Sequence, residues 1–209
     1  MQSTLPIPLR VNGDIKDTEL PRTLAGRMLL AVAATGFVAL CAHVSIPLYF
    51  TPVPITLQTL AVILVGLVLG PVLGFSAMAL YLAEGAMGLP VFSPHGLGGV
   101  AQLLGPTGGF LFSYPFAAAA AGAVVRIVRR GNSQFPAAIL AGMAGIAGIA
   151  GIAASVPIFV MGAGWLAHLL HLSPGAAWHM AVAPFLPGEI LKVTAAAGIY
   201  TSLRRWSRS

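Results

Sequence analysis

The segment APFLPGEILKVTAAAGIY, residues 183–200, is apolar over most of its length but carries a carboxylate at Glu189 and an ammonium at Lys192. The two are three positions apart, so on a helix they share a face. Pro184 and Pro187 lie just upstream, where proline fits the first turn of a helix or the residues leading into it. Ionisable groups at membrane depth are costly and usually face a bundle interior or a polar cavity. We therefore expect this face to form one wall of a ligand site, with a structural ion pair between helices as the alternative.

The composition around this segment is that of an integral membrane protein. Of the 209 residues, 57% are hydrophobic and only 8% are charged, which leaves too little polar surface for a soluble domain of this size. Three runs of 56, 41 and 58 residues contain no Asp, Glu, Lys or Arg, whereas one membrane span needs about 20 residues. The +6 charge lies in short basic clusters beside apolar runs, which is typical of cytoplasmic flanks and not of nucleic-acid binding.

The predicted fold is an all-α bundle of six transmembrane helices within residues 27–205. A cytoplasmic tail (1–26) precedes it, and a basic tail (206–209) follows. Breakers such as Gly70-Pro71 separate the spans. The spans are expected at about 27–46, 55–69, 72–87, 107–128, 135–162 and 183–203.

Arginines precede the first span and follow the fourth and the sixth, which predicts that both termini are cytoplasmic. The glycine-rich connection 89–106 then lies outside, and its apolar content predicts a lid folded onto the bundle. Glu84 at the outer end of the third span and Gln58 at the outer start of the second should gather with Glu189 and Lys192 beneath it. Glu84 could instead be protonated, or its side chain could extend to the outer membrane–water interface. Gln58 could instead form a hydrogen bond between helices.

Other motifs give little evidence for chemistry. Gly105-Pro-Thr-Gly-Gly109 lacks the Lys-Ser/Thr ending of a phosphate-binding loop, so nucleotide binding is not expected. His168, His171 and His179 have no further ligand at a defined spacing, so neither a metal site nor catalytic residues are predicted. A membrane enzyme that uses Glu84, Glu189 and these histidines is the alternative from another functional class.

Small residues recur every four positions on the first span, at Ala31, Thr35 and Ala39. Such a stripe lets another helix approach closely. It is predicted to dock a partner protein, and packing within the bundle is the alternative.

Three stretches resemble the BioY family, the biotin-binding S components of energy-coupling-factor (ECF) transporters. They are Pro52-Val-Pro-Ile-Thr-Leu-Gln-Thr59, then Tyr81-Leu-Ala-Glu-Gly-Ala-Met-Gly-Leu-Pro-Val-Phe92 with Gly105-Pro-Thr-Gly-Gly-Phe-Leu111, and Pro184-Phe-Leu-Pro-Gly-Glu-Ile-Leu-Lys192. The family generally has Asp where this chain has Glu189, and a common Tyr is replaced by Phe110.

The resemblance implies a six-helix S component of a bacterial cytoplasmic membrane that binds biotin with high affinity near the outer face. It implies no cofactor of its own. A transmembrane coupling protein and two ATPase subunits would supply the energy, and self-association stays open. Biotin needs hydrogen-bond acceptors, a donor or cation, and apolar walls. The residues expected to supply them are Gln58, Tyr81, Glu84, Phe92, Tyr114, Glu189 and Lys192. An S component for another vitamin is the nearest alternative.

Overall fold

The computed structural model describes residues 23–131 and 136–206, with side chains described at 23–128 and 145–206. This part of the chain is mostly helical, and within it five stretches are long and apolar enough to cross a membrane by length and composition. The expectations for residues 1–22 and 207–209, and for the first residue of the span predicted from 135, lie outside the described residues. The elements in chain order are α1 (Leu24–His43), β1 (Ser45–Leu48), β2 (Thr51–Thr56), α2 (Gln58–Ala86), α3 (Gly99–Leu104), α4 (Gly108–Gly131), α5 (Pro136–Leu169), α6 (Pro174–Ala181), the 3-10 turn η1 (Ala183–Phe185) and α7 (Leu186–Trp206).

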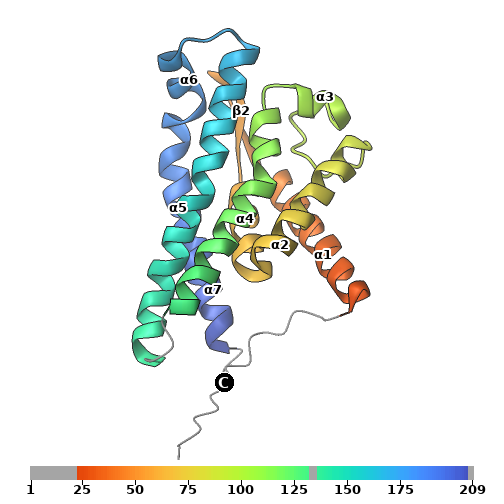
Figure 1. The fold of residues 1–209 in the computed structure, drawn as a ribbon. Helices are drawn as coiled ribbons and strands as arrows, with labels where there is room; N and C mark the ends of the chain where they lie inside the picture. The colour runs from red at the N-terminus through yellow and green to blue at the C-terminus, as the bar shows by residue number, and fades with distance from the viewer. Residues whose placement is uncertain (1–22, 132–135, 207–209) are drawn as a thin grey trace, which may run out of the picture.

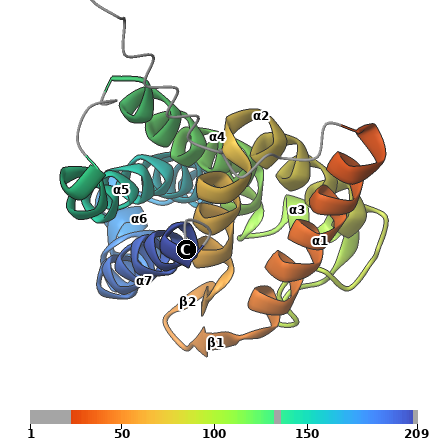
Figure 2. The same cartoon turned by 90° about the horizontal axis from the view of Figure 1, so that it is seen from below.

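Helix α2 occupies the middle of the bundle. Seen from below, α4, α5 and α7 lie on one side of it and α1 on the other (Figure 2). In Figure 1, α3 and α6 lie at one end of the molecule, and the last residues of α7 lie at the other. The two short helices α3 and α6 therefore lie at the same end of the bundle.

The long helix α2 reverses direction in its middle. Gly70 has φ 77° and ψ 179°, a left-handed backbone that interrupts the helix and favours glycine. The side chains of Gln58 and Tyr81 are hydrogen-bonded at 2.6 Å, although a straight helix would separate residues 23 positions apart by about 35 Å. The tight return predicted at Gly70-Pro71 is therefore present, and α2 consists of two antiparallel arms. Gly122 of α4 packs against this return, where a Cβ atom would lie 2.5 Å from the Pro71 nitrogen.

The connection between α1 and α2 is a β-hairpin, so the all-α prediction is wrong here. Strands β1 and β2 pair antiparallel, with Ser45 opposite Thr56 and Ile46 opposite Ile55. Helix α1 consequently ends at His43 and not at residue 46. Prolines at positions 47, 52 and 54 disfavour helix but are tolerated in short edge strands, which explains the difference.

Two further boundaries differ from the sequence prediction. Helix α5 continues to Leu169, seven residues beyond the predicted end at 162, and Pro157 lies inside it without ending it. The segment between the spans predicted at 135–162 and 183–203 contains the short helix α6. The Ser173 side chain caps this helix by accepting from the Ala176 backbone N–H at 3.3 Å. A similar short helix, α3, interrupts the connection 89–106.

The small-residue stripe of α1 faces inward. Ala31 and Thr35 are 8% and 2% exposed, Ala39 is half-buried, and Thr35 Oγ1 donates to a Glu84 carboxylate oxygen of α2 at 3.2 Å. Small side chains allow α1 to pack closely on α2. This burial corrects the prediction that the stripe docks a partner protein, because the stripe is an internal packing face.

Candidate ligand-binding site

A buried ion pair joins three helices at one end of an internal cavity. Glu189 and Lys192 of α7 are 5% and 9% exposed, and their Oε2 and Nζ atoms lie 3.6 Å apart. Thr59 of α2 connects them, since its hydroxyl donates to Glu189 Oε2 at 3.0 Å and accepts from Lys192 Nζ at 2.9 Å. The other oxygen, Oε1, accepts from Ser155 of α5 at 2.8 Å. The two charges balance, so this cluster offers donors and acceptors without a net charge.

A second polar network connects the cavity to the connection 89–106. Gln58 Nε2 donates to the Tyr81 hydroxyl at 2.6 Å, and Tyr81 donates to the Val91 carbonyl at 2.7 Å. The Tyr114 hydroxyl donates to Gln58 Oε1 at 3.3 Å. All three polar side chains are buried, and the ring of Phe92 packs edge-on against Tyr81 at 5.4 Å. The network thus fixes the start of the connection to α2 and α4.

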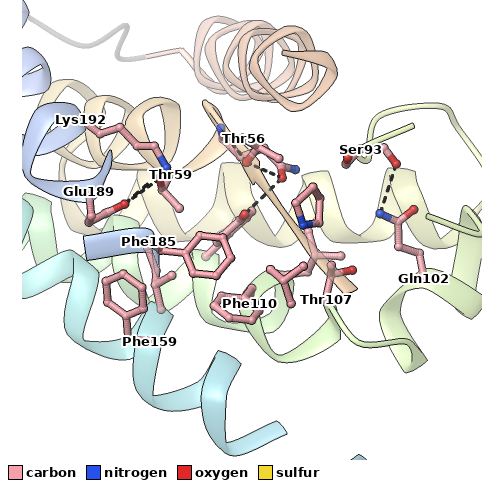
Figure 3. A pocket seen from close by; sticks show the side chains of 16 residues that line it. Thr56, Thr59, Ser93, Gln102, Thr107, Phe110, Phe159, Phe185, Glu189 and Lys192 are labelled. Carbon is pink, nitrogen blue, oxygen red and sulfur yellow. Dashed lines mark hydrogen bonds and ion pairs between the residues drawn. The ribbon is translucent and has the colours of Figure 1, made fainter. Parts of the chain in front are cut away.

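The cavity lies between these two polar groups. Its apolar wall consists of side chains from β2, α4, α5 and η1, namely Val53, Pro54, Phe110, Leu111, Ile158, Phe159 and Phe185. Figure 3 shows Phe110 and Phe185 between the Glu189 end and the Gln102 end, and Phe159 beside Glu189. The volume that the centre of a water molecule can occupy is about 50 Å³, enough for a few waters. The cavity is thus small and partly open, and a larger ligand requires its walls to move.

At the end of the cavity away from Glu189, Gln102 of α3 holds the connection in shape. Its Oε1 accepts from the Gly98 backbone N–H at 3.2 Å, and its Nε2 donates to the Ser93 carbonyl at 3.4 Å. Gln102 is 4% exposed, and a Cβ atom at Gly96 would collide with it. This part of the connection is therefore folded around a buried amide that also lines the cavity.

The structure brings together only part of the predicted site. The cavity wall includes Gln58, Tyr114, Glu189 and Lys192. Tyr81 and Phe92 lie one layer behind it, as the contacts above show.

Glu84 does not line the cavity, so its predicted convergence with the ion pair is wrong. It is half-buried, and its carboxylate accepts from Thr35 on α1. The sequence placed Glu84 at the correct end of its helix but could not show that it points toward α1.

The sequence analysis missed several residues that line the cavity and one, Ser155, that bonds Glu189 from behind the lining. Thr59 directly follows Gln58 in a polar motif, so its hydroxyl carried a signal that could have been used. Ser155 follows a run of Ala and Gly, and no pattern in the sequence distinguishes it. Ser93, Gln102 and Thr107 fall in or beside a connection whose path the sequence does not fix.

The histidines at positions 168, 171 and 179 are exposed and lie outside the cavity lining. Among the described residues, no three His, Cys, Asp or Glu side chains gather in a way that could hold a metal ion.

Comparison with known proteins places the chain in a family. The model of the BioY family matches residues 14–209. The chain belongs to the BioY family. This membership places it among transporters and not among enzymes, and the apolar helices are those of a multi-pass membrane protein.

Two BioY relatives cover most of the chain. The probable biotin transporter BioY of Pyrococcus horikoshii is 36% identical over 153 residues, which are 73% of this chain and 82% of the relative. The biotin transporter BioY of Rhodobacter capsulatus is 37% identical over 177 residues, which are 82% of this chain and 86% of the relative.

The fold also matches a solved structure, the S-component for biotin from an ECF-type ABC transporter. The TM-score is 0.75 at 26% sequence identity, and the match covers 87% of this chain and 92% of the other. The β-hairpin and the reversal in α2 therefore belong to a bundle of the S-component type.

Proposed function

We propose that this chain binds biotin with high affinity and takes it up as the S component of an ECF-type transporter. The observation that carries the proposal is the charge-balanced cluster of Glu189, Lys192 and Thr59 at one end of a small, largely apolar cavity. Biotin combines a ureido ring, with two N–H donors and one carbonyl acceptor, with apolar ring and chain atoms. Such a ligand needs a few placed polar groups and aromatic or aliphatic walls. Family membership and the biotin S-component match support the same ligand.

The proposed topology is a six-span bundle with both termini cytoplasmic, in the cytoplasmic membrane of a bacterium. The two arms of α2 supply two of the spans. The start of α1, the end of α4 and the end of α7 lie at the same end of the molecule, opposite α3 and α6 (Figure 1). Arg27, Arg126 and Arg204 are located at these ends, which fits the excess of positive charge in cytoplasmic segments. The connection 89–106 then covers the cavity from outside.

Energy for uptake is proposed to come from a transmembrane coupling protein and two ATPase subunits. The glycine-rich turn at residues 105–109 supports this division of labour, because it lacks the lysine of a phosphate-binding loop. In the structure this turn forms the start of α4, and the Gly105 carbonyl accepts from Trp165 Nε1 at 2.9 Å. The chain itself is proposed to use no cofactor.

Titration of the purified protein with biotin tests the proposal. Saturable binding at submicromolar concentration is expected, and an excess of thiamin or riboflavin should not compete. A matched control is the double variant Glu189→Gln/Lys192→Met, which removes both charges at nearly constant volume and should abolish this binding. Absence of saturable biotin binding, or displacement of biotin by another vitamin, would reject biotin as the ligand.

A further inference from the structure

The cavity has two polar ends of different character, and they suggest an orientation for the ligand proposed above. At one end, both oxygens of Glu189 and the ammonium of Lys192 lie close together. A ureido group matches this cluster, since its N–H groups can donate to the carboxylate and its carbonyl can accept from the ammonium. A ligand carboxylate here would instead meet the charge of Glu189 and leave the cluster with a net negative charge. The acid group of the ligand therefore belongs elsewhere.

The other end contains polar groups without charge. Ser93, Gln102 and Thr107 line it, and Figure 3 shows all three away from Glu189 and Lys192. Of the lining residues in the described part of the chain, Lys192 alone is positively charged, so this end has no cation of its own.

Ser93 is the informative residue at this end. It is 6% exposed, and its hydroxyl is buried without a hydrogen-bond partner among the described residues. A buried hydroxyl without a partner is costly and uncommon in proteins. The neighbouring Gln102 does not satisfy it, because the Gln102 amide bonds the Ser93 carbonyl and the Gly98 amide instead. The hydroxyl of Ser93 is thus left available to a ligand.

Helix α4 adds to the polarity of this end. The helix begins at Gly108, directly after Thr107, and extends over 24 residues. The Gly108 N–H already donates to the Gly105 carbonyl at 3.0 Å. The N-terminus of the helix still carries a partial positive charge, which favours an anionic oxygen.

We infer that the cavity has a separate subsite for the carboxylate at the end of the ligand tail. This subsite is formed by Ser93, Thr107 and the start of α4, and Gln102 positions Ser93. The subsite recognises the carboxylate by hydroxyl and backbone N–H donors, without a basic side chain. The apolar wall between the two ends accommodates the ring sulfur and the aliphatic chain. Since Ser93 belongs to the connection 89–106, the ligand tail also ties the proposed lid to the bundle.

The test compares two ligands on matched variants of the full chain. The ligands are biotin and an analogue with the same double ring whose tail ends in a methyl group. Loss of a hydrogen bond to a charged group predicts that Ser93→Ala weakens biotin binding by about tenfold or more. The analogue should change by less than about twofold, the usual limit for independent effects.

Two variants make the comparison specific. Thr59→Val, at the ring end, should weaken biotin and the analogue by the same factor. Ser76→Ala removes a hydroxyl that bonds the Val72 carbonyl of its own helix at 3.0 Å outside the cavity, and it should change neither. If Ser93→Ala yields no folded protein, Thr107→Val replaces it and should show the same discrimination.

The inference is overturned if Ser93→Ala and Thr107→Val weaken both ligands equally, or weaken neither. It is also overturned if Thr59→Val is the substitution that distinguishes the two ligands, because the ligand would then lie in the reverse orientation. Failure of the unsubstituted protein to bind biotin would instead reject the proposed function, and the tail subsite with it.

Discussion

Substituting Glu189 by Gln should destabilise the protein more than its small change in shape suggests. The substitution keeps the side-chain volume but leaves Lys192 buried without a counter-charge. At an effective dielectric constant of about 20, two charges 3.6 Å apart attract by about 5 kcal/mol. Part of this attraction offsets the cost of burying Glu189 itself, so we expect a net loss of about 3 kcal/mol, the lower end of values for breaking a buried pair.

The assay is thermal unfolding in detergent, followed by the fluorescence of Trp165, Trp178 and Trp206. For a chain of this size, a loss of about 3 kcal/mol lowers the unfolding midpoint by about 6–12 °C. Glu84→Gln is the matched control, since that carboxylate bonds the Thr35 hydroxyl. It should cost less than about 1 kcal/mol, because the glutamine amide oxygen can still accept from the Thr35 hydroxyl.

A double-mutant cycle with Lys192→Met separates the ion pair from other effects. The double variant Glu189→Gln/Lys192→Met should be more stable than the sum of the single losses predicts, by about 2 kcal/mol, because neither charge is left unpaired. Additive losses, or equal losses for Glu189→Gln and Glu84→Gln, would refute the reasoning that the 3.6 Å pair is a coupled unit.

Three further predictions follow from single contacts. Gly122→Ala should lower stability by about 2 kcal/mol in the same thermal assay, because its Cβ would meet the backbone of the α2 return. Gly145→Ala is the control. It has open space around it and should be neutral or slightly stabilising. Tyr81→Phe removes the hydrogen bond from the Tyr81 hydroxyl to the Val91 carbonyl in the connection 89–106. It should speed the release of bound biotin by about fivefold in a chase experiment. An unchanged rate would show that this bond does not hold the connection. Ser155→Ala removes the donor to Glu189 Oε1 and should weaken biotin binding by about fivefold in titration, and unchanged affinity would show that this oxygen is not used.

The sequence predicted those features of the fold that depend on composition and on strong local signals. Apolar runs identified the membrane helices, and Gly70-Pro71 identified the return inside α2, because a left-handed glycine followed by proline interrupts a helix wherever it occurs. The β-hairpin after α1 was missed, since its strands are short and contain prolines that indicate only a turn. The fifth span was predicted to end at 162, whereas helix α5 continues to Leu169.

For the site, the sequence predicted the charged residues better than their partners. Glu189 and Lys192 were identifiable because charges in an apolar segment need compensation. The helix rotation that turns Glu84 toward Thr35 could not be predicted, because it depends on how closely α1 approaches α2. Ser93 and Gln102 depend on the path of a connection with several glycines, where local preferences allow many conformations.

The reversal at Gly70 has a consequence for the bilayer. The first arm of α2, residues 58–69, rises only about 18 Å, whereas the hydrocarbon core is about 30 Å thick. Strand β2 leads into this arm, so under the proposed six-span topology extended chain and not helix covers the remaining depth of that crossing. An extended chain in hydrocarbon is tolerated only where protein or a cavity shields it, and Val53 and Thr56 of β2 are indeed buried and line the cavity. On this topology the peptide groups of β2 at that depth pair with strand β1, whereas those of a continuous helix would pair within the helix.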